Sequence, residues 1–200
     1  MKHVGAVTAT AADGTKVPNP GALVIVGPLV NVVLAVPESV GRAMLALGRE
    51  PPRVDVKLLI DTGAQITSVH DEVAAQLGLP PIRMAPMVGV SGKPEDYPVY
   101  RMVVLIAVAD ATGKGIIGLE TDVVGVPASA GHAEMKGLLG RDFLRHLRLV
   151  YDGPTATFEL SEQIIAKPAD AKSPLGSSPG KPRKAKRKME KQSRKHNRGR

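Results

Sequence analysis

The chain of 200 residues has no cysteine and no tryptophan, and it has only three tyrosines and two phenylalanines. The absence of cysteine excludes a disulfide framework and thiolate chemistry. Because aromatic side chains are so few, Val, Leu and Ile must fill the core, which favours short β-strands packed as a barrel. The five histidines show no metal-ligand spacing, and no cysteine could complete such a set, so we expect no metal and no other cofactor.

Long apolar runs are also lacking. The most apolar stretch, residues 22–36, is too short to cross a bilayer and is interrupted by Gly27, Pro28 and Asn31. About 20 mostly polar residues precede it, which does not fit a signal peptide. The chain has no phosphate-binding loop and no nucleophile-elbow pattern. We therefore expect a soluble, cytoplasmic protein without a membrane partner.

Positive charge is concentrated at the C-terminal end. Residues 181–200 contain 11 of the 27 Lys and Arg and a single acid, Glu190, so their charge is +10. The rest of the chain is near neutral at −2, which gives the net charge of +8. From about residue 166 the composition shifts to Pro, Ala, Ser, Gly and Lys, which predicts a disordered tail over 166–200. We expect one domain over 21–165, preceded by a partly flexible segment, 1–20.

Apolar patterning and turn residues predict a mainly β domain with two or three short helices. The helices are expected at 71–77, 141–146 and 39–47. Gly78 and Gly48 follow the first and the third of them, and Gly140 precedes the second. The predicted strands are 22–26, 29–36, 54–60, 100–108, 116–124, 147–151 and 155–160.

Two segments point to chemistry. The first runs Leu58-Leu59-Ile60-Asp61-Thr62-Gly63-Ala64, which predicts a carboxylate at the exit of a buried strand, at a tight turn. The second, residues 137–144, has the sequence Gly-Leu-Leu-Gly-Arg-Asp-Phe-Leu. Together, and in this order, the two segments resemble the active-site loop and the later hydrophobic-Gly-Arg segment of the retroviral-type (retropepsin-like) aspartic proteases.

The resemblance implies a retropepsin-like acid-protease barrel with one lobe per chain, and it implies a role for each matching residue. Asp61 would be the catalytic acid, and Thr62 would form hydrogen bonds across a dimer. Gly63 would let a substrate backbone approach closely, and Ala64 matches the small residue of the family. In the second segment, Gly140 would pack against the active-site loop where no Cβ fits, and Arg141 matches the family's arginine.

The sequence departs from the family pattern at Gln65, where retroviral enzymes usually carry an acid that pairs with the arginine. A Gln–Arg hydrogen bond is weaker than a carboxylate–Arg pair. Arg141 would therefore engage Gln65, Asp142 or another acid, and the bonding at the dimer interface is open.

A glycine-bearing hairpin is expected between the two segments. Its tip, which resembles the flap that closes over substrate in this family, comprises Val88, Gly89, Val90, Ser91 and Gly92. Pro94 and Pro98 stiffen its return side, unlike the retroviral flap, and an ordinary polar hairpin is the alternative. Apolar walls at Val88, Val90 and Leu139 would favour extended peptides with apolar side chains.

The chain has a single Asp-Thr-Gly, so one domain supplies half of a carboxylate pair. The resemblance thus implies an aspartic endopeptidase that works as a homodimer, with Asp61 from each chain activating a water that attacks a polypeptide substrate. Two alternatives remain open. The same fold could serve as a non-catalytic dimerisation or peptide-binding module, or the protein could act as a nucleic-acid binder through its basic tail.

Residues 181–200 could make a weak, phosphate-directed contact with nucleic acid, or they could be a solvated extension, or an extension that the protease removes. Deletion of 166–200 should leave most peptide cleavage intact if the domain is the enzyme. The measurement is cleavage rate and nucleic-acid affinity, with and without the tail, over a range of salt concentrations. Loss of cleavage in a still-folded deletion variant would favour the nucleic-acid binder.

Overall fold

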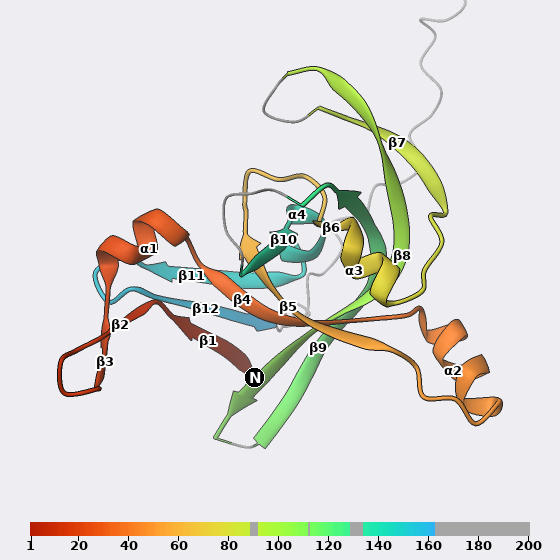
Figure 1. Cartoon of the computed structure of the whole chain (residues 1–200). Coiled ribbons are helices and arrows are strands. Elements are labelled where there is room, and N and C mark those ends of the chain that lie inside the picture. Colours follow the sequence, from red (N-terminus) through yellow and green to blue (C-terminus); the bar gives the residue numbers. More distant parts are fainter. Residues whose placement is uncertain (89–91, 112, 129–133, 163–200) are drawn as a thin grey trace, which may run out of the picture. The chain divides into compact units, whose positions relative to one another are not determined.

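The structure, a computed structural model, describes residues 1–88, 92–111, 113–128 and 134–162 (Figure 1). This part of the chain is mainly β-strand, with four short helices, and it confirms the predicted fold class. The helices are α1 (Pro20–Val26), α2 (Glu38–Ala46), α3 (Asp71–Gln76) and α4 (Arg141–Leu144). The strands are β1 (Lys2–Ala6), β2 (Thr8–Thr10), β3 (Lys16–Pro18), β4 (Leu29–Ala35), β5 (Arg53–Ile60), β6 (Ser68–His70), β7 (Arg83–Val88), β8 (Pro94–Asp110), β9 (Gly113–Val126), β10 (Met135–Leu139), β11 (Leu147–Asp152) and β12 (Thr157–Glu162).

Six of the described strands close into a barrel. They pair in the order β8, β4, β5, β10, β6 and β9, and β9 pairs again with β8. Most of these pairs are antiparallel, but β10 runs parallel to β5, and β6 runs parallel to β9. Beside the barrel, β12 and β11 continue the sheet from β1, and β7 extends β8 into a long hairpin.

The core follows from the alternation of side chains along each strand. In β5, Val56, Leu58 and Ile60 are buried, while the residues between them face outward or are half-buried. The same period of two in β4 buries Val30, Val32 and Leu34. Val, Leu and Ile thus form most of the core, and the rings of Phe143 and Phe158 are its largest fully buried side chains.

Most of the predicted elements are confirmed, with small shifts at their ends. One prediction, a strand at 22–26, is wrong, because these residues form α1. The Asn19 side chain accepts a hydrogen bond from the Ala22 N–H, Pro20 occupies the first helical turn, and Gly27 ends the helix at a φ of 76°. Capping at both ends thus outweighs the strand preference of Val and Ile.

The sequence analysis predicted no strand in residues 1–20, whereas the structure pairs β1 with β12 from Lys2 to Ala6. Gly5 lies opposite Phe158 in this pair, and a Cβ on Gly5 would lie 2.1 Å from the Phe158 ring. The buried ring covers the strand where Gly5 has no side chain, so β1 contributes to the packing of the domain. The described residues from Met1 to Glu162 lie in one compact unit.

No helix in the described residues is long and apolar enough to cross a membrane. The tail predicted at 166–200 lies outside the described residues.

Replacement of Gly5 by Ala should lower the free energy of unfolding by about 1–3 kcal/mol, because the Phe158 ring must move to make room. Gly41→Ala is the matched control, since a Cβ at this position in α2 meets only ordinary contacts at 3.7 Å. We expect that control to be neutral or stabilising by up to about 1 kcal/mol. Urea denaturation of the three proteins measures the difference, and equal stability of G5A and wild type would contradict the packing of β1.

Candidate active site

Asp61 follows β5 at the point where β5 runs beside β10. Leu59 and Ile60 of β5 are in register with Leu138 and Leu139 of the parallel strand. The Asp61 N–H continues this pairing by donating to the Leu139 carbonyl at 3.1 Å. Because the two strands are parallel, their carboxyl ends meet at one edge of the barrel, so Asp61 and Gly140 lie side by side there.

The Asp61 carboxylate is held by its own loop. Its Oδ1 accepts hydrogen bonds from the Gly63 N–H at 2.8 Å and the Ala64 N–H at 3.2 Å. Thr62 and Gly63 are exposed, and Asp61 itself is half-buried. The backbone thus fixes one carboxylate oxygen, while Oδ2 makes no hydrogen bond to a described residue and is available for an external partner.

Gly140 lies against the segment that follows this loop. A Cβ on Gly140 would lie 2.5 Å from the Ile66 carbonyl carbon and 2.8 Å from the Thr67 nitrogen, and no backbone atom can move away cheaply. Next to it, the Arg141 N–H donates to the Ala64 carbonyl at 3.0 Å. The two segments singled out in the sequence are therefore in direct backbone contact.

Asp142 is a site residue that the sequence analysis treated only as a candidate partner for Arg141. Its Oδ1 accepts three hydrogen bonds, from the Thr67 N–H at 2.9 Å, the Thr67 hydroxyl at 2.7 Å and the Phe143 N–H at 2.9 Å. The Gly140 N–H in turn donates to the fully buried Thr67 hydroxyl oxygen at 3.1 Å. The signal in the sequence that could have found Asp142 was an acid in the first turn of the helix after Gly140. A carboxylate at such a position can accept hydrogen bonds from free backbone N–H groups.

Within the described chain, Arg141 takes none of the partners offered for its side chain. It is exposed, and it makes no ion pair with a described residue, while the Asp142 carboxylate is directed to Thr67. The backbone of Gln65 accepts from the Asp142 N–H at 3.2 Å, and the Gln65 side chain is exposed. In this chain, backbone hydrogen bonds and Asp142 join the two segments where the family pattern would use a carboxylate–Arg pair.

The expected flap corresponds to the β7–β8 hairpin, which extends from the barrel at the end where the β5–β6 connection also lies (Figure 1). Val88 ends β7 and is exposed, and Gly92 has a φ of 70°. The other three tip residues, Gly89, Val90 and Ser91, lie outside the described residues.

Asp122 of β9 holds the base of this hairpin. Its carboxylate forms ion pairs with Arg83 of β7 at 3.2 Å and with Arg101 of β8 at 2.7 Å. No pattern in the sequence indicated these two ion pairs, because the three residues are far apart along the chain and meet only through the pairing of three strands.

Leu139, expected on the wall of a cleft, is fully buried in the core. This burial contradicts the expectation, because the position of Leu139 in β10 directs its side chain into the barrel. Its contribution to the loop is its carbonyl oxygen, which accepts from Asp61.

Several carboxylates near the barrel surface are paired with lysines. The Lys136 ammonium of β10, 2.8 Å from Glu72, lowers the pKa of that carboxyl through its hydrogen bond and its charge. In the same way Lys57 lowers the pKa of Glu134, and Lys2 lowers that of Glu159. These pairs stabilise the fold above the ordinary carboxyl pKa of about 4.5, and this contribution is lost as the pH falls through the lowered values. No cluster of three metal-ligating side chains occurs among the described residues.

The site thus combines a turn-held aspartate with a glycine packed under its loop. Residues 52–143, which contain the first segment and all but the last residue of the second, match the model of the aspartyl protease family. This part of the chain is similar to that family. The match confirms the resemblance noted in the sequence and supports a protease-type function.

Among solved structures, the chain matches the crystal structure of a retropepsin-like aspartic protease from Rickettsia conorii. The two are 16% identical, the match covers 80% of this chain and 92% of that chain, and the TM-score is 0.38. A search of curated proteins found no match.

Asp142→Ala should lower the free energy of unfolding by about 2–3 kcal/mol, because it leaves buried donors of Thr67 and Phe143 without an acceptor. Asp142→Asn, whose amide oxygen can still accept, should lose clearly less. Thermal and urea denaturation of both variants provide the measurement. Equal losses in the two variants would show that the hydrogen bonds to Oδ1 do not hold the loop.

Proposed function

We propose that the protein is an aspartic endopeptidase that acts as a homodimer, with one Asp61 from each chain. The observation that carries the proposal is the fixed Asp61 carboxylate, whose Oδ1 is held by two backbone N–H groups while Oδ2 has no partner in the described chain. A carboxylate held in this way keeps its orientation, which a catalytic acid or base requires.

Two such carboxylates within hydrogen-bond distance share one proton, because like charges so close cannot both ionise cheaply. The ionised member takes a proton from a water, and the water oxygen attacks the peptide carbonyl carbon. The protonated member donates to the carbonyl oxygen. As the resulting tetrahedral intermediate breaks down, the C–N bond cleaves and the leaving nitrogen takes a proton from the pair.

The proposal includes a second chain because the sequence contains one Asp-Thr-Gly and the described residues form one barrel. A two-fold axis beside the 61–64 loop would bring two copies of Asp61 together. Thr62, which is exposed next to Asp61, would then form hydrogen bonds with the partner chain's loop.

The substrate class follows from the hairpin. A polypeptide in extended form fits beneath a β-hairpin whose tip can bend at glycine, and closure of such a hairpin removes water from the reacting bond. Exposed Val88 and Met84 on β7 offer apolar contact for side chains on either side of that bond.

Asp61→Asn should reduce peptide cleavage by about a thousandfold or more, because an amide can neither take nor give the shared proton. The Asn side chain keeps an oxygen for the Gly63 and Ala64 N–H groups, so the fold should persist. The measurement is cleavage of a diverse peptide mixture from pH 4 to 8, read by mass spectrometry. Asp55→Asn, the same change at an exposed position of β5, is the matched control.

The assay needs a folding control at its acid end, where the Lys–Glu pairs described above weaken. Cleavage per chain should also fall on dilution, as the dimer dissociates. Equal cleavage by wild type and D61N, or the absence of cleavage by a folded wild-type dimer, would contradict the proposal and favour a non-catalytic module.

A further inference from the structure

Helix α1 exposes two large apolar side chains that the domain itself does not cover. Leu23 of this helix is buried against the domain, but Val24 and Ile25 are 83% and 76% exposed. Val24 has the largest exposed fraction of the large apolar residues in the described chain. We call Val24 and Ile25 the α1 patch.

The α1 patch is tied to the catalytic loop by a short and fixed connection. The Gly27 N–H donates to the Leu23 carbonyl at 2.9 Å and ends the helix. The next residue, Pro28, accepts from the N–H of Ile60, the neighbour of Asp61, at 3.0 Å. A Cβ on Gly27 would lie 2.5 Å from the Leu59 side chain, so the glycine lets the end of α1 lie against β5.

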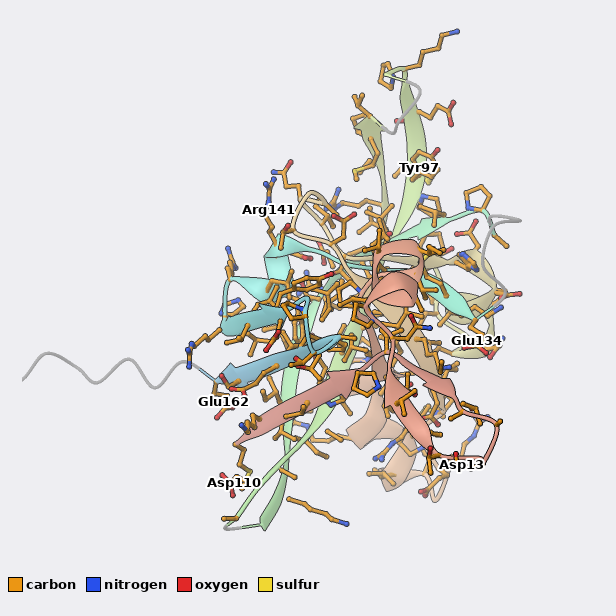
Figure 2. All side chains as sticks on the ribbon, turned by 90° about the vertical axis from the view of Figure 1, so that its left-hand side faces the viewer. Asp13, Tyr97, Asp110, Glu134, Arg141 and Glu162 are labelled. Carbon is orange, nitrogen blue, oxygen red and sulfur yellow. The ribbon has the colours of Figure 1, made fainter. Side chains whose placement is uncertain are left out.

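Figure 2 views the domain from the α1 side. The helix lies in the middle of this face, below the hairpin that carries Tyr97. A second chain that brings its own Asp61 next to this one must approach the 61–64 loop, and the α1 patch is joined to that loop by the short connection through Pro28 and Ile60.

The segment of the sequence around α1 carries no charge, which suits an interface with a second copy of the same chain. Residues 17–37 contain no Asp, Glu, Lys, Arg or His. A two-fold interface places the same surface on both sides, so a charged patch near the axis would meet its own charge, whereas an uncharged apolar patch does not.

Helix α2 also exposes apolar side chains, but it lacks both the uncharged surroundings in sequence and the connection to the Asp61 loop. Leu45 and Leu47 at the end of α2 are also exposed, but Arg42 and Arg49 are close to them in sequence. Moreover, α1 and α2 lie at opposite ends of the β4–β5 pair (Figure 1), and Asp61 is at the α1 end.

We propose that Val24 and Ile25 of α1 pack against a second copy of this chain, so that α1 is part of the two-fold interface that completes the site. The inference rests on the proposed homodimeric function and names a surface that this dimer uses. The occupant is thus an uncharged, apolar surface identical to the α1 patch or directly beside it.

The test compares the dimer dissociation constant of the full chain with that of Val24→Glu/Ile25→Glu, measured by analytical ultracentrifugation. Introduced carboxylates should weaken the dimer by about 100-fold or more, since they bring like charges into an apolar contact. Cleavage per chain should fall with the dimer fraction and recover at high protein concentration. Leu47→Glu, equally exposed at 75% but on α2, is the matched control and should leave the constant unchanged.

A milder variant, Val24→Thr/Ile25→Thr, guards against loss of the helix and should weaken the dimer less than the glutamate variant. A glutamate variant that remains folded with a dissociation constant within about threefold of wild type would overturn the proposal. If it also cleaves at the wild-type rate, the peptidase stands and only the role of α1 fails. Lower thermal stability without a change in the dimer constant would place α1 against its own chain and would likewise overturn the proposal.

Discussion

The close packing of Gly140 against Ile66 and Thr67 is the constraint on which the candidate site depends. A Cβ at residue 140 would overlap backbone atoms of Ile66 and Thr67, which directly precede β6, the strand that pairs with β10. Because the glycine fits, the Thr67 hydroxyl can bridge the Gly140 N–H and the Asp142 carboxylate. These contacts join the end of β10 to the Asp61 loop, so the position of the carboxylate is set by the barrel as well as by its own turn.

The same arrangement supports the proposed second chain. The backbone uses one oxygen of Asp61, and the second oxygen makes no hydrogen bond to a described residue. The described residues offer one barrel, one such loop and an uncharged helix, α1, connected to that loop through Pro28. Under the proposal, catalysis, dimerisation and the exposure of Val24 and Ile25 would follow from one requirement, that two copies of the loop face each other.

The sequence indicated the Asp61 loop because the residues that make it are contiguous. Apolar alternation in β5, the turn residues Thr62 and Gly63, and the helix of 71–76 with Gly78 after it all act over short distances. It failed for residues 22–26, where caps at Asn19 and Gly27 outweigh β-branched side chains. It also placed Leu139 on a cleft wall, since the pattern of the segment does not reveal which side of β10 faces the barrel.

By itself, the sequence determined the mainly β class, the likeness to the aspartyl proteases and the candidate aspartate, because these depend on residue types at fixed spacing. Only the tertiary structure decided that Asp142 holds Thr67, that Asp122 joins Arg83 to Arg101, and that β1 packs Gly5 under Phe158. These contacts link residues far apart along the chain. Their partners are chosen by strand register and by the closure of the barrel, and neither is encoded in any local pattern.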